Sequence, residues 1–226
     1  MAKHIGIAAC SSEGAGLCYR TICLEGEELL GKHAHPEVTL HNHPLSEYIR
    51  CGREGWAKLM LSSAKKLAAA GADFVICPDN TIHSAYDLLA AKSPIPWLHI
   101  AEEVTREAKS RGYRRLGILG TRWLMKGPVY PSRLGPERIE HCVPPAQDMA
   151  HVNRIIFDEL VRGVFKPASR RYLKGLIGRL KRSGCDAIVL ACTEIPLIIT
   201  QADSPLPILD STRLLARAAL RKAVGR

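Results

Sequence analysis

The sequence predicts an α/β protein made of two similar halves, each with a parallel sheet, that arose by internal duplication. Short apolar runs alternate with longer helix-like segments along the chain, which favours parallel strands joined by helices. Runs without polar residues, such as Ala187-Ile-Val-Leu-Ala191, are typical of strands that helices cover on both faces. Three strand-like segments also recur in the same order about 111 residues further along the chain.

The repeat is the strongest signal in the sequence, because chance rarely preserves both order and spacing. Its period is too long for a solenoid, so it indicates duplication of a whole domain. The matching pairs are Ile5–Cys10 with Leu116–Thr121, Gly71–Asp79 with Gly184–Cys192, and Ile95–His99 with Leu206–Asp210, at offsets of 111, 113 and 111 residues.

Hydrophobic periodicity places the elements in order. In the first half we expect strands at 4–10, 37–42, 73–78 and 96–99, and helices at 15–31, 53–70, 82–91 and 101–111. In the second half we expect strands at 115–120, 138–142, 186–191 and 207–209, and helices at 127–134, 147–163, 168–183, 194–199 and 212–224. We expect an N-terminal lobe at 1–100 plus 207–226, and a C-terminal lobe at 101–206.

Length and composition are those of a globular protein. A chain of 226 residues permits one large domain or two of about 100 residues each. Apolar residues make up 46% and charged residues 24%. No apolar run approaches the roughly 20 residues that span a bilayer, so we expect no membrane segment. The N-terminus lacks the apolar region and cleavage site of a signal peptide, which predicts a cytoplasmic protein.

The formal net charge of +10 raises the question of an anionic partner. Nucleic acid and a small anionic substrate are the two classes to consider. The basic residues are spread along the chain, and only 5% of residues are aromatic, so platforms for base stacking are scarce. We therefore expect a small anionic substrate and no nucleic acid.

Several polar side chains directly follow predicted strands, and open α/β sheets bind ligands beyond the carboxyl ends of their strands. If the two halves face each other, these side chains converge on one cleft. Asp79 and Cys192 occupy equivalent positions in the repeat, which indicates two facing catalytic groups. The set that follows strands is Ser11, Ser12, Asp79, Asn80, Thr81, Thr121, Cys192 and Thr193.

Each of these candidates also has a purely structural interpretation. Asp79-Asn-Thr81 could be an Asx turn that caps a helix, or a site where helix N–H groups receive a bound carboxylate. Cys192 could be a buried inert thiol, or a thiolate favoured by the helix that begins after it. Lys166 could attract an anion, or be an ordinary solvated lysine.

Other cofactor patterns are weak. There is no C-x-x-C pair and no G-x-x-x-x-G-K-[ST] motif, and Glu13-Gly-Ala-Gly16 falls short of a dinucleotide fingerprint. Four histidines, His33, His35, His41 and His43, could suggest a metal, but we expect them on an exposed loop, with His43 a possible substrate contact. We expect no metal and no other cofactor.

Three motifs resemble one known family. Ala191-Cys-Thr-Glu-Ile-Pro196, followed by Pro207-Ile-Leu-Asp-Ser-Thr212, is the strongest of them. Asp79-Asn-Thr-Ile-His83 falls where that family has Cys-Asn-Thr-x-His, and Leu119-Gly-Thr121 with Gly127-Pro-Val-Tyr130 is similar to its mid-chain segment. Over nearly its whole length the chain thus resembles the aspartate/glutamate racemase superfamily.

The resemblance implies two Rossmann-like lobes related by pseudo-twofold symmetry, an active site between them, a homodimer, and catalysis without pyridoxal phosphate or metal. It makes Asp79 and Cys192 the catalytic pair. The substrate-binding candidates are Ser11, Ser12, Asn80, Thr81, Thr121, Tyr130, Lys166 and Thr193. The sequence departs from the family pattern in having Asp79 for a cysteine, Ala8-Ala-Cys-Ser-Ser12 for a glycine-rich segment, and no arginine near residues 42–46.

Racemisation needs a base on one face of the α-carbon and an acid on the other, with roles exchanged in the reverse direction. Free Asp titrates near ~3.9 and free Cys near ~8.5, a gap worth about 6 kcal/mol. The resting pair would thus be the Asp79 carboxylate facing the Cys192 thiol. Three functions remain open: a racemase of an acidic amino acid, an isomerase or decarboxylase of a small dicarboxylate, and a non-catalytic binder.

Overall fold

The computed structural model describes residues 2–225 and divides the chain into two compact units. The first unit combines Met1–Glu103 with Thr212–Arg226, and the second is Val104–Ser211. Both are α/β units with all-parallel sheets, which confirms the predicted fold class. Helix α6 (Ile100–Ser110) and helix α11 (Ser211–Val224) each begin in one unit and end in the other.

The first unit has a three-stranded parallel sheet of order β2-β1-β3. Its strands are β1 (Ile5–Ala9), β2 (Val38–Asn42) and β3 (Phe74–Ile76). Its helices, besides parts of α6 and α11, are α1 (Ser12–Glu25), α2 (Glu27–Leu30), α3 (Leu45–Arg50), α4 (Arg53–Ala69) and α5 (Tyr86–Leu89), with 3-10 turns at Ile82–Ala85 and Ala90–Lys92.

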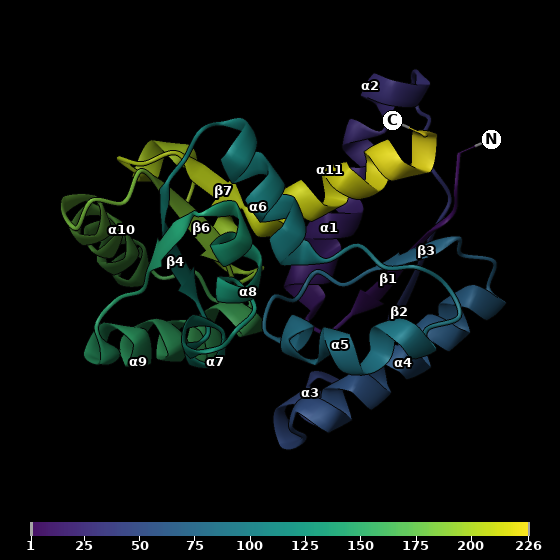
Figure 1. Cartoon of the computed structure of the whole chain (residues 1–226), viewed down its shortest axis with the longest axis horizontal. Coiled ribbons are helices and arrows are strands. Elements are labelled where there is room, and N and C mark those ends of the chain that lie inside the picture. The colour runs from purple at the N-terminus through teal and green to yellow at the C-terminus, as the bar shows by residue number, and fades with distance from the viewer. Residues whose placement is uncertain (1, 226) are drawn as a thin grey trace. The chain divides into compact units, whose positions relative to one another are not determined.

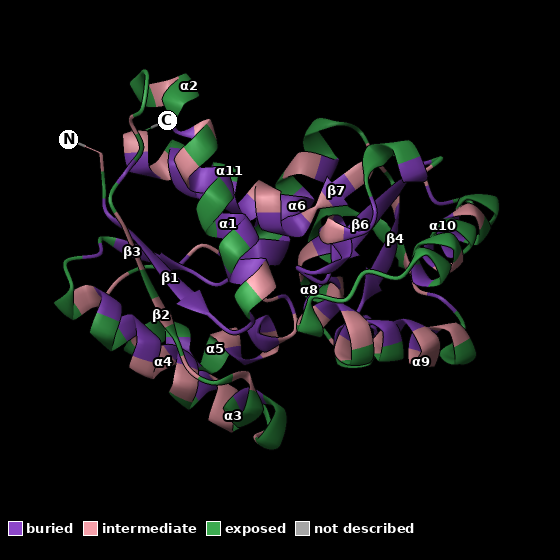
Figure 2. Ribbon diagram, turned by 180° about the vertical axis from the view of Figure 1, so that it is seen from behind, coloured by how far each residue is buried: buried purple, intermediate pink, exposed green. Residues whose placement is uncertain are grey.

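The two faces of this sheet pack against different helices because side chains alternate along a strand. From β1, Ile5, Ile7 and Ala9 lie in one apolar cluster with residues of α1 and α11, and these two helices run side by side in Figures 1 and 2. Ala8 and Cys10 lie in a second cluster with residues of α4. All five residues of β1 are buried, as Figure 2 shows.

The second unit has a four-stranded parallel sheet of order β5-β4-β6-β7. Its strands are β4 (Arg115–Gly120), β5 (Glu140–Cys142), β6 (Ala187–Ala191) and β7 (Ile208–Asp210). Its helices are α7 (Arg122–Lys126), α8 (Pro131–Leu134), α9 (Ala146–Arg154) and α10 (Pro167–Arg182). A π-helical segment, Ile155–Glu159, follows α9, and 3-10 turns lie at Gly135–Glu137, Leu160–Arg162, Ile195–Leu197 and Gln201–Asp203.

The two sheets share one strand order, as expected of a duplicated domain. β1, β2 and β3 correspond to β4, β5 and β6. The counterpart of β7 in the first unit is a single bridge between Val75 and Trp97, so the predicted strand at 96–99 is wrong. Pro96 within the segment and Pro94 just before it have no N–H to donate, and only two backbone hydrogen bonds join the segment to Val75.

Other sequence expectations are also wrong. The predicted helix at 194–199 contains only a 3-10 turn, Ile195–Leu197. In the predicted helix at 127–134 only residues 131–134 are helical, as α8, and a separate short helix, α7, ends just before Gly127. Thr121 starts α7 by accepting a hydrogen bond from the Leu124 N–H at 3.2 Å. The histidines at 41 and 43 do not lie on an exposed loop, because His41 is within β2 and both rings are half-buried.

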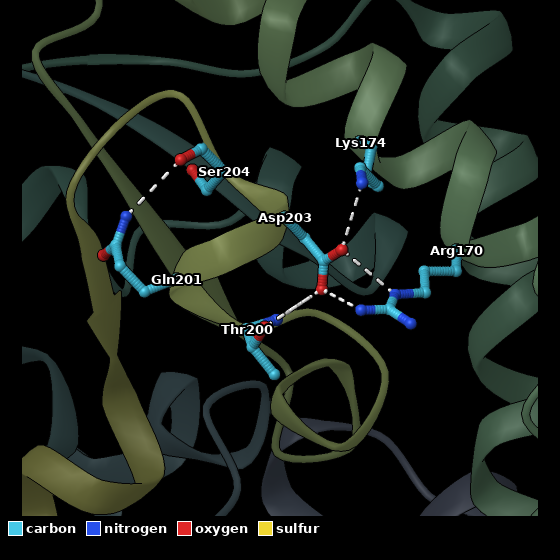
Figure 3. A network of polar contacts seen from close by, with 6 residues as sticks. All are labelled: Arg170, Lys174, Thr200, Gln201, Asp203 and Ser204. Carbon is cyan, nitrogen blue, oxygen red and sulfur yellow. Dashed lines mark hydrogen bonds and ion pairs between the residues drawn. The ribbon is translucent and has the colours of Figure 1, made fainter.

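A network of charged groups fixes the end of the second unit's core. Asp203 accepts hydrogen bonds from Arg170 at 3.1 and 2.8 Å and from the Thr200 N–H at 3.1 Å, and it pairs with Lys174 at 3.2 Å, as Figure 3 shows. The Arg170 hydrogen bond is the main reason that the pKa of Asp203 lies well below its usual value. The network ties the 3-10 turn at Gln201–Asp203 to α10.

Candidate active site

Two polar segments follow neighbouring strands at one edge of the first unit's sheet. β1 pairs with β3 in parallel, with Ile7 opposite Ile76, so both strands end at the same edge. Ser11 follows β1 as the buried N-cap of α1, and Ser12 is the exposed first residue of that helix. The segment from Cys77 to Thr81 follows β3.

Asp79 lies half-buried in the turn after β3. Its Oδ1 accepts a hydrogen bond from the Ile82 N–H at 3.1 Å, so the carboxylate caps the 3-10 turn at Ile82–Ala85. That turn is only four residues long, so its dipole is much weaker than that of a full helix. Asn80 is buried and Thr81 is half-buried beside Asp79.

His83 fixes this turn against the strand that precedes it. Its Nε2 lies 3.0 Å from the Cys77 carbonyl oxygen, in a buried contact. Burial first, and then the negative charge of Asp79, raise the pKa of the Cys77 thiol well above its usual value. Cys77 is thereby a protonated core residue, and burial likewise raises the pKa of Cys185 to about 11.

The second unit places Cys192 and Thr193 at the end of β6, where both are buried. The Cys192 thiol donates a hydrogen bond to Glu194 Oε2 at 2.9 Å, and the Thr193 hydroxyl donates to the same oxygen at 3.1 Å. Glu194 is only 3% exposed. A 3-10 turn, and not the expected α-helix, follows Glu194. The group that contacts the thiol is the Glu194 carboxylate. Glu194 can therefore receive the thiol proton.

Thr121 lies beside this segment because β4 pairs with β6, with Gly120 opposite Ala191. Gly120 allows a close approach of the two strands, since a Cβ there would lie 2.6 Å from the Ala191 carbonyl oxygen. Thr121 directly follows β4 and Cys192 directly follows β6, so both residues lie at the same edge of the sheet. Both side chains are buried.

Tyr130 is almost completely buried, and burial raises the pKa of its phenol. Its hydroxyl hydrogen-bonds with the side chain of Ser211, which in turn donates to the Leu190 carbonyl oxygen at 2.8 Å. Tyr130 thus joins the ends of β6 and β7.

Lys166 lies apart from these strand ends, at the start of α10. Its side chain is exposed and pairs with Glu159 at 3.3 Å. It borders a cavity of about 280 Å³ that no other predicted site residue lines; the lining residues are Phe165, Lys166, Pro167, Arg170, Leu197, Ile198 and Thr200.

Sequence reasoning did not assign a role to Glu194 or His83. Both lie within motifs that the sequence displays, Cys192-Thr-Glu194 and Asp79-Asn-Thr-Ile-His83. Adjacency to a candidate catalytic residue was the available signal. The contacts with Cys192 Sγ and the Cys77 carbonyl depend on the turn that follows each strand.

The described part of the chain holds neither a cluster of three candidate metal ligands nor a membrane-spanning helix. Within residues 2–225, no group of three or more His, Cys, Asp or Glu side chains is arranged to hold a metal ion. None of the helices in that same range has the length and apolar character needed to cross a bilayer.

The two units have parallel sheets with the same strand order, as in a duplicated α/β protein. In both units polar side chains follow the ends of matching strands, where α/β proteins bind their ligands. The model of the Asp/Glu/hydantoin racemase family matches residues 18–219. The chain belongs to this family, which supports an isomerase.

Known relatives extend along nearly the whole chain. A broad specificity amino-acid racemase of Bacillus subtilis, RacX, is 25% identical over 193 residues, covering 82% of this chain and 81% of that protein. The crystal structure of a candidate Asp/Glu racemase from Yersinia pestis is similar with a TM-score of 0.87 and 32% identity, covering 98% and 99% of the two chains. An aspartate racemase homologue from Pyrococcus horikoshii gives a TM-score of 0.84 and 29% identity, with the same coverage.

Proposed function

We propose that this protein racemises a small amino acid by two-base proton transfer at Cα, without pyridoxal phosphate or metal. The observation that carries the proposal is the matched placement of Asp79 and Cys192. Each follows the strand that pairs with the first strand of its unit, β3 with β1 and β6 with β4. The racemase named among the relatives supports the same class of reaction.

This mechanism requires the two strand ends to act on opposite faces of one α-carbon. The Asp79 carboxylate takes the α-proton, the C–H electron pair passes into the carbanion, and the Cys192 thiol delivers a proton from the other face. In the reverse direction Cys192 is the base. Glu194 Oε2, 2.9 Å from Sγ, is then the acceptor that receives the thiol proton.

The carbanion and the substrate carboxylate need hydrogen-bond donors. Ser11, Asn80, Thr121 and Thr193 are buried polar groups at the two strand edges, and Ser12 and Thr81 lie beside them. Tyr130 and Lys166 contribute less directly, since the first joins strand ends and the second borders a separate cavity.

The substrate we propose is an acidic amino acid such as aspartate or glutamate, and the active form a homodimer. The net charge of +10 favours an anionic substrate. The names of the relatives, a candidate Asp/Glu racemase and an aspartate racemase homologue, point to the same substrate class.

A second function, isomerisation or decarboxylation of a small dicarboxylate, is favoured by one observation. Asp79 Oδ1 already accepts a hydrogen bond from the Ile82 N–H, which fits the polar, non-basic role that this reaction assigns to Asp79. In that reaction Cys192 is the nucleophile or proton donor.

Incubation of single enantiomers in D2O separates the possibilities. Deuterium at Cα together with growth of the opposite enantiomer supports the racemase. Release of CO2, or formation of fumarate from maleate, supports the second function. Saturable binding without turnover of any tested amino or dicarboxylic acid would indicate a non-catalytic binding protein.

The catalytic thiol is tested by Cys192→Ala, with Cys23→Ala as the matched control in α1. We expect turnover to be lost in the first variant and kept in the second, with unchanged circular dichroism in both. Near-normal racemisation by Cys192→Ala rules out the assignment.

A further inference from the structure

The exposed face of α10 is basic along its whole length. The stretch from Leu160 to Cys185, which contains this helix, has eight Lys and Arg residues and no Asp or Glu. All eight cations are exposed, and they are Arg162, Lys166, Arg170, Arg171, Lys174, Arg179, Lys181 and Arg182. A surface with charge of a single sign attracts a partner of the opposite charge.

The helical period places two of these cations at the middle of the face. With 3.6 residues per turn, Arg182 follows Arg171 by about three turns, so both lie on the same side of α10. Figure 2 shows exposed residues along the length of this helix. The opposite side is buried in the core of the second unit through Ser169, Leu173, Leu176, Ile177 and Leu180.

Acidic side chains neutralise the two flanks of the basic face. On one flank, Asp203 pairs with Arg170 at 2.8 Å and with Lys174 at 3.2 Å. On the other flank, Asp148 pairs with Arg179 at 3.0 Å. These three cations therefore have their charge compensated within the second unit.

The middle of the face keeps its charge. Within residues 2–225, no acidic side chain forms an ion pair with Arg171 or Arg182. Lys181 donates a hydrogen bond to the Pro205 carbonyl oxygen at 3.2 Å, which is not an ion pair. Three exposed cations on one helix are thus available to an anionic partner.

Two exposed apolar side chains lie just before the start of α10. Val164 is 40% exposed and Phe165 is 46% exposed. Phe165 and Arg170 line the same cavity, so the phenyl ring lies close to the basic face. An anionic bilayer matches both features, because its headgroups bind cations and its interface accepts an aromatic ring. A DNA duplex binds cations through its phosphates but has no apolar layer for these two side chains.

We propose that α10, together with Val164 and Phe165, is a docking surface for an anionic lipid bilayer. Arg171, Lys181 and Arg182 contact the headgroup phosphates, and Phe165 enters the interface. Each cation near such a surface raises the partition coefficient about fivefold (about 1 kcal/mol), so the attachment is peripheral and reversible. It does not depend on the reaction that the protein catalyses.

Sedimentation of the full chain with lipid vesicles tests the proposal. We expect the protein to pellet with vesicles of phosphatidylglycerol, which is anionic, and to remain in solution with phosphatidylcholine. Salt should release it, because the Debye length falls from about 10 Å at 0.1 M to about 3 Å at 1 M. Pelleting with neither lipid, or equally with both, overturns the proposal.

The double variant Arg171→Gln/Arg182→Gln removes the two cations at the middle of the face. Its partition coefficient on phosphatidylglycerol should fall about 25-fold, fivefold for each cation. Lys58→Gln/Lys65→Gln is the matched control, because it removes two exposed cations that lie about two turns apart on α4. The control should bind like wild type. Equal losses in the two variants would show a general effect of net charge and overturn the proposal.

Two further measurements distinguish a bilayer from other polyanions. Phe165→Ser keeps every cation, so it should weaken vesicle binding while its retention on heparin stays that of wild type. Vesicle binding as tight as that of wild type would refute a lipid interface, because charge alone would then explain it. A DNA duplex that displaces the protein from vesicles at equal phosphate concentration would assign the surface to nucleic acid instead.

Discussion

Substituting Gly120 by alanine should disturb the end of the strand that lies beside Cys192. A Cβ at this position would lie 2.6 Å from the Ala191 carbonyl oxygen and 2.6 Å from Leu124 Cδ2. The leucine can rotate away, but the carbonyl belongs to the backbone of β6. Relief of that contact requires the paired ends of β4 and β6 to separate.

The expected cost follows from the size of this clash. Overpacking a rigid site typically costs about 1–3 kcal/mol, and about 2 kcal/mol is reasonable where one of two clashing groups is backbone. For a chain of this length that corresponds to a fall in Tm of roughly 4–8 °C. Because Cys192 follows Ala191 directly, kcat should fall by more than the loss of folded protein explains.

Scanning calorimetry and urea titration measure the stability, and a racemase assay on the folded fraction measures the activity. Gly16→Ala is the matched control. A Cβ there has no atom within 4 Å, and the residue lies within α1, so alanine should stabilise by about 0.5–1 kcal/mol. A Gly120→Ala variant as stable as wild type would refute the backbone clash.

Substitutions at three further positions address the site and the charge network. Asp79→Cys should keep or raise racemisation, whereas activity unchanged in Asp79→Ala would show that Asp79 is neither acid nor base. Glu194→Gln keeps the shape but cannot accept the thiol proton, so kcat/KM should fall at least tenfold for both enantiomers, because the two directions share one transition state; an unchanged kcat/KM would contradict this. Asp203→Asn should lower Tm at pH 7. Hydrogen bonding from Arg170 depresses the pKa of Asp203, so the ionised carboxylate stabilises the fold above the unfolded-state pKa near ~3.9, and this stabilisation is lost at lower pH. The difference in Tm between Asp203→Asn and wild type should therefore shrink as the pH falls. A Tm difference that does not depend on pH would refute this reasoning.

The parallel strands could be predicted because continuous apolar runs between helix-like segments are typical of buried parallel strands. Seven of the eight expected strands are present, and Trp97 is a single bridge because prolines precede it. The short helices could not be placed reliably. α7 depends on the cap at Thr121, and its five residues contain too little periodicity to recognise.

For the site, the repeat singled out Asp79 and Cys192 and also the polar residues next to them. It could not show which neighbour each group contacts. Glu194 reaches Cys192 only because a 3-10 turn begins where a helix was expected, and the contact between His41 and Ser63 joins residues from β2 and α4. Such contacts depend on side-chain direction and on turn geometry, which periodicity does not encode.

The return of α11 to the first unit has a consequence for the order of folding during synthesis. Leu215, Ala219 and Ala223 complete the apolar cluster around Ile5 and Ile7, and the Lys3 N–H donates to the Ala223 carbonyl at 2.8 Å. The ribosome makes the first unit's sheet early but makes α11 only after the whole second unit. The second unit is contiguous and has all its strands before that point. Nascent chains should thus bury the later-made core first, while one face of the N-terminal sheet waits with α1 in place but without α11.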